Sequence, residues 1–295
     1  MLPNEVAQKI KNYDIQGSEI SRYAIESFKN FYKTHSSVKD IEKAGKILYF
    51  AMKSEVVTQN CIKSVIKNLK KQNSGDIFNK SIDEFLKYKG GAEKKISEID
   101  FIPQDAKILT HCYSKTVIGM LKSAKNSGKN FTVINTETRP NFTGRMTSDE
   151  ISMSGIKNIH ITDSAVAHFI RDAHFVLVGC DAIDEYGILN KIGTLNIAII
   201  AKFYNKPVYV AVSSVKLDKE NKLSEIKELR KKEEMWGDRN LNKNNKNLNN
   251  KNLIEIENIA YDFVAQKLIS KVISEFGILN FDETIDKFKG VQFCE

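Results

Sequence analysis

Residues 175–181 read Phe-Val-Leu-Val-Gly-Cys-Asp, so a short apolar run ends in a glycine, a cysteine and the carboxylate of Asp181. A short run that is apolar throughout, without alternation, is typical of a strand buried on both faces of a parallel sheet. Four further runs share this pattern. They are Lys107–Thr110, Phe131–Asn135, Ile159–Thr162 and Val208–Val212.

Amphipathic stretches fill the intervals between these runs and predict helices. They are Ser114–Asn126, Thr147–Ser154, Ser164–Arg171 and Thr194–Tyr204. Buried strands that alternate with helices predict an α/β fold with a doubly wound, Rossmann-like parallel sheet and right-handed crossovers. The carboxyl ends of the strands then meet at one edge, where open α/β sheets bind ligands. We expect that edge to be lined by Thr110, Thr136, Asp163 and Gly179–Asp181.

The first hundred residues differ in composition from the rest. They are rich in Lys and Glu and contain no proline between Pro3 and Pro103. Apolar residues recur there at spacings of three and four, which predicts an N-terminal helical domain over residues 1–101. The sheet domain is expected over residues 102–295. The predicted helices of the first domain are Glu5–Tyr13, Ser18–Lys33, Ser37–Met52, Glu55–Lys71 and Ser81–Ile99.

The C-terminal third contains a polar tract at residues 240–252, which read NLNKNNKNLNNKN. It has almost nothing to bury, so we expect a flexible surface insertion. Leu253–Phe276 is then predicted to form a short strand and an amphipathic helix.

Composition excludes several classes of protein. The chain has 295 residues and a formal charge of +8. No apolar run approaches the ~20 residues of a membrane span, and the N-terminus has no apolar signal region, so we expect a cytoplasmic protein. Arg and aromatic residues are not interleaved in the basic runs, so direct nucleic-acid binding is not expected. No C-x-x-C pair or zinc spacing is present, which predicts free thiols and no metal. The cysteines are Cys61, Cys112, Cys180 and Cys294.

Two nucleophilic or acidic side chains follow predicted strands. Cys112 comes where the strand ending at Thr110 gives way to a helix, a position that lowers a thiol pKa. Its alternative is a buried structural cysteine. Asp181 can act as a general acid or base, or it can cap the N-terminus of a helix.

Two further motifs carry cationic groups. Arg139 and Arg145, with Gly144 between them, offer forked donors for a phosphate and a close backbone approach, or else a solvated loop of charge pairs. Asn190 and Lys191 stand between two glycines ahead of a predicted helix, which favours an anion site. Neither the Walker spacing nor the dinucleotide fingerprint is present.

Taken in order, the segments THCYS, TETRP-x-x-x-GR, ITDSAV, VLVGCDAI and NKIGT resemble the translation initiation factor 2B alpha/beta/delta superfamily. The resemblance implies a helical domain followed by a Rossmann-like domain, assembled as a homodimer or hexamer. One branch of the superfamily comprises sugar-phosphate isomerases, among them ribose-1,5-bisphosphate isomerase. The other comprises subunits of the exchange factor for initiation factor 2.

The isomerase branch implies roles for the residues singled out above. Cys112 would be the acid–base group at carbon and Asp181 the one at oxygen, with no cofactor. The resemblance thus implies an isomerase of AMP metabolism that converts ribose 1,5-bisphosphate to ribulose 1,5-bisphosphate. The groups that hold phosphate and hydroxyls would be Arg139, Arg145, Asn190, Lys191 and Lys216, together with the loop residues Gln16, Gly17 and Ser18.

Some positions depart from the isomerase pattern. Gln16 stands where the isomerases carry an arginine in an Ile-Arg-Gly-Ala loop, Tyr113 stands where they prefer asparagine, and Cys180 replaces alanine. These departures keep a second hypothesis open, a non-catalytic regulatory subunit that binds initiation factor 2 and takes a sugar phosphate or nucleotide as regulator.

Overall fold

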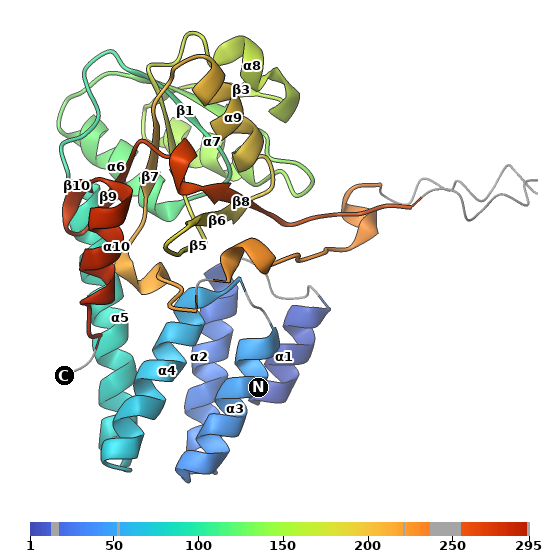
Figure 1. Cartoon of the computed structure of the whole chain (residues 1–295), viewed down its shortest axis with the longest axis vertical. Helices are drawn as coiled ribbons and strands as arrows, with labels where there is room; N and C mark the ends of the chain where they lie inside the picture. The colour runs from blue at the N-terminus through green and yellow to red at the C-terminus, as the bar shows by residue number, and fades with distance from the viewer. Residues whose placement is uncertain (13–17, 52–53, 221, 237–254, 294–295) are drawn as a thin grey trace, which may run out of the picture.

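A computed structural model describes residues 1–12, 18–51, 54–220, 222–236 and 255–293. The predicted insertion at 240–252, the loop residues Gln16 and Gly17, and Cys294 lie outside the described residues. In Figure 1 a bundle of helices lies beneath a sheet flanked by further helices, and the C-terminus returns to the side of the bundle.

The helical bundle is built from amphipathic helices whose apolar faces meet in one core. Ile20, Ile41, Val65 and Phe85 from successive helices are almost fully buried there. The last of these helices begins earlier than the predicted Ser81, because Ser74 Oγ accepts a hydrogen bond from Ile77 N and caps it. The helices are α1 Pro3–Lys11, α2 Ser18–Tyr32, α3 Val38–Ala51, α4 Val56–Lys71 and α5 Gly75–Ser97.

The main sheet has the order β10-β9-β7-β4-β1-β2-β3 in the described residues, and only the β10–β9 pair is antiparallel. The chain runs from β1 outward to β3 and then returns to place β4 on the other side of β1. The gap between β1 and β4 is therefore the switch point of the topology. The strands are β1 Lys107–Thr110, β2 Thr132–Thr136, β3 Lys157–Ile161, β4 Phe175–Gly179, β7 Val208–Ala211, β9 Lys271–Ser274 and β10 Gly277–Leu279.

Helices cover both faces of this sheet. Along β4, Phe175 and Leu177 point into one core and Val176 and Val178 into the other. This alternation confirms the predicted α/β fold, with the central strand β4 buried on both sides. The edge strand β3 is only partly buried, unlike the prediction for its run. The helices are α6 Lys115–Asn126, α7 Thr143–Met153, α8 Val166–Phe169, α9 Thr194–Phe203 and α10 Phe281–Lys289. Short 3-10 turns are η1 Asp163–Ala165, η2 Ser214–Lys216, η3 Leu223–Glu225, η4 Lys232–Glu234 and η5 Gln266–Leu268.

A small antiparallel sheet of β5 (Ala182–Ile183), β6 (Gly187–Lys191) and β8 (Tyr261–Ala265) was not predicted. The amphipathic helix predicted within Leu253–Phe276 is wrong, because the described part of that segment forms β8 and β9 and the last helix begins only at Phe281. The segment forms strands because β8 pairs with β6 and β9 pairs with β7, and both partners lie far away in the sequence.

Buried hydrogen bonds join the bundle to the α/β part. The side-chain amide of Asn60 on α4 donates to the carbonyls of Val215 and Leu217, at 2.9 Å each. Ser54 Oγ donates to Glu228 Oε2 at 2.7 Å. At the C-terminal end, the ring of Phe293 packs edge-on against Phe85. The two parts of the chain are therefore locked together along α4 and α5.

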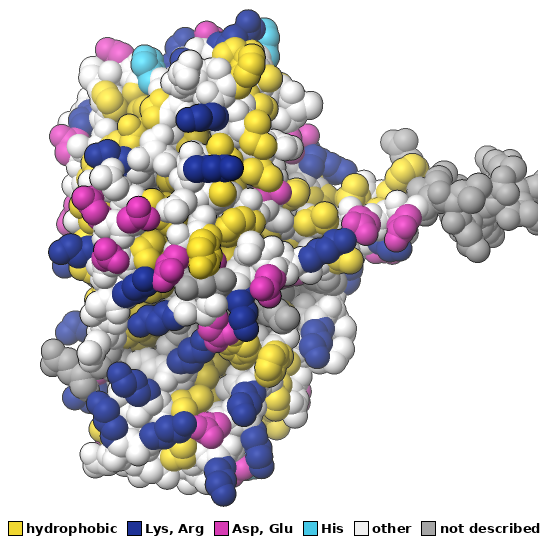
Figure 2. Space-filling model, viewed as in Figure 1, with side chains coloured by type: hydrophobic (Ala, Val, Ile, Leu, Met, Phe, Trp, Pro, Cys, Tyr) yellow, Lys and Arg dark blue, Asp and Glu magenta, His cyan; other side chains and the backbone are white. Residues whose placement is uncertain are grey.

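Figure 2 shows Lys and Arg side chains over the whole visible face, most densely over the helical bundle in the lower part of the view, where few acidic side chains lie among them. Among the described helices, none is both long and apolar enough to cross a membrane.

Candidate functional site

Cys112 lies two residues beyond the end of β1, in a left-handed backbone conformation with φ of 65°. Its amide donates to Thr138 Oγ1 at 3.0 Å, and its Sγ lies 3.3 Å from Thr143 Oγ1. Thr138 and Phe142 also have positive φ, at 59° and 56°. Such angles are costly for residues with a Cβ, and here they bring the loop after β2 against the thiol.

The thiol is partly buried, and burial raises the pKa of Cys112. The charge of Lys191 and the hydrogen bond from Thr143 act in the opposite direction but do not outweigh burial. The predicted lowering by a helix N-terminus is therefore wrong. Helix α6 begins only at Lys115, and its cap is Ser114, whose Oγ accepts from Val117 N.

Asp181 follows the last residues of β4, the strand that pairs with β1. Its amide donates to the carbonyl of Leu189 at 2.8 Å, and strand β5 begins at the next residue. The alternative role as a helix cap is therefore wrong. Cys112 and Asp181 come from the two strands that border the switch point, and the charge of Asp181 acts on the thiol.

Asn190 and Lys191 lie within β6, and the predicted anion site at the following helix is not formed as expected. Asp262 Oδ2 accepts hydrogen bonds from the amides of Gly193 and Leu195, at 2.7 and 3.0 Å. The N-terminus of α9 is thus already occupied by a carboxylate. Asn190 Nδ2 donates to Thr194 Oγ1, also within the protein. Lys191 Nζ remains partly exposed, 4.9 Å from the centre of the Tyr261 ring.

Arg139 and Arg145 both lie on the surface with their guanidinium carbons over the Phe142 ring, 4.8 and 3.8 Å from its centre. Arg139 also donates to the carbonyl of Met235 at 3.0 Å, and Arg145 lies 3.8 Å from Glu137 Oε2.

Gly144 provides the close backbone approach that its motif predicts. A Cβ added there would lie 1.8 Å from the carbonyl oxygen of Thr136. Any larger residue at position 144 would therefore push the segment that carries Arg139 and Arg145 away from β2.

Lys216 lies in η2, and its Nζ donates to the carbonyl of Cys180 at 2.6 Å, next to Asp181. Cys112, Asp181, Lys191 and Lys216 are thereby gathered at one edge of the sheet. Ser18 opens helix α2, and its side chain lies outside the described residues.

Other polar residues of this edge were not predicted. His111 is buried, with Nε2 2.8 Å from the carbonyl of Ile192 and Nδ1 2.6 Å from Thr136 Oγ1. It therefore connects the loop that carries Cys112 to the residue after β6. Burial and the charge of Asp181 both raise the pKa of Glu55, just before α4, and of Tyr261, on β8. Their positions depend on contacts between distant segments, so no local pattern marked them.

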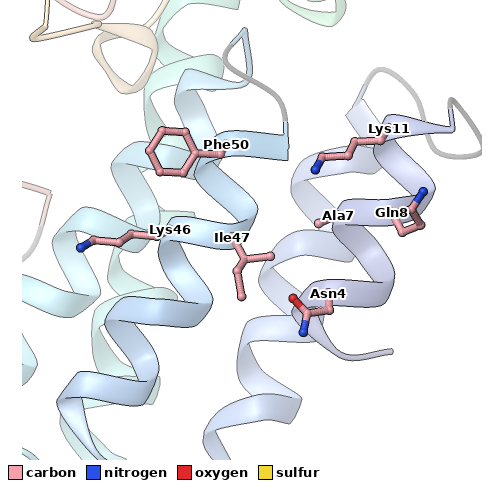
Figure 3. Close-up of a pocket in the computed structure, with 7 residues that line it drawn as sticks. All are labelled: Asn4, Ala7, Gln8, Lys11, Lys46, Ile47 and Phe50. Atoms are coloured by element: carbon pink, nitrogen blue, oxygen red, sulfur yellow. The ribbon is translucent and has the colours of Figure 1, made fainter.

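A surface hollow of about 530 Å³ lies elsewhere, between α1 and α3 (Figure 3). Ile47 points into the space between these helices, whereas Lys46 points away from it. None of the residues predicted to form the site lines it. The lining residues are Asn4, Ala7, Gln8, Lys11, Lys46, Ile47 and Phe50.

Within the described part of the chain, no group of three His, Cys, Asp or Glu side chains is arranged to hold a metal ion.

Comparison with known proteins places this geometry in a family. Residues 14–281 match the model of the Initiation factor 2 subunit family. The chain is 31% identical over 303 residues to ribose 1,5-bisphosphate isomerase of Pyrococcus furiosus, covering 97% of this chain and 92% of that protein. The identity to the protein of the same name from Methanocaldococcus jannaschii is 33% over 285 residues, covering 93% and 90%.

A solved structure agrees with the fold. The translation initiation factor eIF-2B of Pyrococcus horikoshii OT3 superposes with a TM-score of 0.78 at 24% identity, over 95% of this chain and 98% of that one. The family match spans helices α2 to α5 of the bundle as well as the strand ends that carry Cys112 and Asp181. The chain belongs to the Initiation factor 2 subunit family.

Proposed function

We propose that this protein is an aldose–ketose isomerase of sugar 1-phosphates that converts ribose 1,5-bisphosphate to ribulose 1,5-bisphosphate. The observation that carries the proposal is the placement of Cys112 and Asp181 on the two strands that flank the switch point. Both side chains are partly exposed, and Lys191 lies close enough for its charge to act on the thiol. A thiol and a carboxyl are the two acid–base groups that such a reaction needs.

The phosphate on C1 blocks the anomeric oxygen, so the ring must open as the C2 proton leaves. The Cys112 thiolate removes that proton, the bond from C1 to the ring oxygen breaks, and protonated Asp181 gives its proton to this oxygen. The resulting enol then collapses. The Cys112 thiol protonates C1, and the Asp181 carboxylate takes the 2-hydroxyl proton, which leaves the ketone and restores both residues.

The charges around the pair fit these steps. Lys191 favours the thiolate, opposing the burial that raises the pKa of Cys112. Lys191, Lys216, Arg139 and Arg145 are the cations that would hold phosphate, with Asn190 and the loop of Gln16, Gly17 and Ser18.

The relatives support the isomerase as the enzyme class, because the Pyrococcus and Methanocaldococcus proteins that carry that name align over nearly the whole chain. Tyr113, a departure from the isomerase pattern, turns away from the reacting groups. Its hydroxyl donates to Glu150 Oε2 at 2.7 Å, and Lys122 holds the other oxygen of that carboxylate. Tyr113 therefore joins the loop before α6 to α7.

We expect the protein to act as a homo-oligomer, a dimer or hexamer. Met153 on α7 and Phe203 on α9, which leave 89% and 78% of their surface exposed, are apolar side chains that such an interface would be free to cover.

The test is to add ribose 1,5-bisphosphate, with and without AMP, and to follow ribulose 1,5-bisphosphate by NMR. We expect Cys112→Ser and Asp181→Asn each to reduce turnover by a factor on the order of 10² or more. Cys61→Ala and Asp172→Asn are matched controls outside the site and should retain turnover.

The wild-type protein could instead give no product while ligand shifts its NMR signals. That result would refute the isomerase proposal and favour a regulatory subunit. Binding to initiation factor 2 subunits would then be the next measurement.

A further inference from the structure

The hydroxyl of Thr143 lies beside the Cys112 thiol, and the reaction described above does not use it. Thr143 is the first residue of α7, and its Oγ1 lies 3.3 Å from Cys112 Sγ. Within the described part of the chain, this hydroxyl makes no other hydrogen bond. Because a hydroxyl can donate as well as accept, Thr143 can serve a sulfur that has lost its proton.

The same face of α7 holds the main chain of Cys112. Thr147 lies about one helical turn after Thr143, so the two side chains lie on one face of the helix. Thr147 is buried, and its Oγ1 donates to the carbonyl of Cys112 at 2.7 Å. Two threonines of one helix face therefore contact Cys112, one at its carbonyl oxygen and one at its sulfur.

The start of α7 is fixed against the sheet from two sides. Gly144 follows Thr143, and a Cβ added to it would lie 1.8 Å from a main-chain oxygen of β2, so the first turn of α7 lies directly against that strand. Asp163, two residues after β3, accepts hydrogen bonds from the amides of Thr138 and Arg139 at 2.9 and 2.7 Å. These contacts hold the loop between β2 and α7 in the conformation that brings Thr143 to the thiol.

The groups around the thiol act on it in opposite directions. Burial raises the pKa of Cys112, and the charge of Asp181, after β4, raises it further. The charge of Lys191, on β6, and the hydrogen bond with Thr143 lower it. In the proposed reaction Lys191 also holds phosphate, so part of its charge is neutralised once substrate binds. The Thr143 hydroxyl carries no charge, and its support of a thiolate remains.

We propose that Thr143 is a further catalytic residue, whose hydroxyl donates a hydrogen bond to the Cys112 thiolate. The inference rests on the proposed isomerase for its catalytic meaning, but the hydrogen bond can be tested without turnover. Thr143 itself transfers no proton. It donates to the sulfur before the C2 proton leaves and again after C1 has been protonated. Between these steps the proton from C2 resides on Cys112, so the proton balance of the reaction is unchanged.

The first experiment measures the pH dependence of Cys112 alkylation by iodoacetamide, followed on the Cys112 peptide by mass spectrometry. Thr143→Val replaces the hydroxyl by a methyl group, so we expect the midpoint of the profile to rise by about one unit. Thr143→Ser keeps the hydroxyl and should stay near the wild type. The control is Thr284→Val on α10, which removes a buried hydroxyl that donates to the carbonyl of Asn280 and should leave the midpoint unchanged.

Two outcomes of this titration would overturn the proposal. One is a Thr143→Val midpoint equal to that of the wild type, which would show that the hydroxyl does not support the thiolate. The other is a midpoint in Thr143→Ser that is displaced as far as in Thr143→Val, because the change would then follow the altered packing and not the lost donor.

The second experiment measures turnover of ribose 1,5-bisphosphate at a pH below the alkylation midpoint. A rise of about one unit in the thiol pKa leaves about one tenth of the thiolate, so we expect kcat of Thr143→Val to fall by a factor on the order of 10 with KM nearly unchanged. Thr143→Ser should recover most of this loss. An unchanged kcat in Thr143→Val would overturn the catalytic role. If the wild-type protein turns over no substrate, the proposed function fails, and the alkylation profile alone decides whether the hydrogen bond is made.

Discussion

Asn60→Ala removes both hydrogen bonds that join α4 to η2. The Asn60 side chain is 7% exposed, and the residues whose carbonyls it meets, Val215 and Leu217, are 0% and 2% exposed. Leaving one buried carbonyl without its donor lowers the stability of the fold by about 1–3 kcal/mol. For two carbonyls we expect a loss of about 2–4 kcal/mol, because water that enters the space left by the side chain restores part of the hydrogen bonding. Loss of the side-chain amide thus removes a large share of the stability of a domain this size.

Urea unfolding followed by circular dichroism measures this change. Asn68→Ala is the matched control on the same helix, because Asn68 Nδ2 donates to Ser81 Oγ within the bundle, at 3.0 Å. We expect a loss of about 1 kcal/mol there. A loss below about 0.5 kcal/mol in Asn60→Ala would refute the reasoning that these bonds are buried and direct. Because Asn60 also holds the segment that carries Lys216, its variant should lose more turnover than the control.

Two further predictions concern charge. The folded-state pKa of Glu55 is raised, so the proton it binds stabilises the fold below pH ~4.5, and this contribution is lost as the pH rises through about 7. Urea unfolding at pH 5 and pH 8 should therefore show a loss of stability that is smaller in Glu55→Gln than in the wild type, by about 1–3 kcal/mol. An equal loss in both proteins would contradict this prediction. Lys191→Gln removes the cation that favours the Cys112 thiolate. Alkylation of Cys112 by iodoacetamide at pH 8, followed by mass spectrometry, should therefore slow by a factor on the order of 10. The control Lys202→Gln, on α9, should react like the wild type. An unchanged rate in Lys191→Gln would show that this lysine does not act on the thiol.

The sheet could be predicted because the burial of its strands is visible in the local sequence, as short runs of apolar residues. Residues 175–179 are apolar on both faces, and the structure buries them in two cores. The strand ends followed from that, since parallel strands present their carboxyl ends at one edge. The sequence alone therefore predicts that Cys112 and Asp181 lie at the same edge of the sheet.

The rest depended on contacts between segments far apart in the chain. Strand β6 looked like a loop before a helix, because its partner β8 lies about seventy residues later. For the same reason Asp262 could not be foreseen as the carboxylate at the start of α9. Glu55 reaches the site from the helical bundle, and only the buried contacts of α4 place it there. The sign of the Cys112 pKa shift also needed the folded environment, since burial and a helix terminus act in opposite directions.

The capping of α9 by Asp262 has a consequence for how this scaffold changes over evolution. Many proteins cradle phosphate on the main-chain amides of a helix N-terminus. Here Asp262 already accepts from those amides, so in the proposed isomerase the phosphate would be held by side chains such as Lys191 and Lys216. A few point mutations can then retune or remove ligand affinity while the framework stays intact. A scaffold of this kind is free to diversify in function without a new fold.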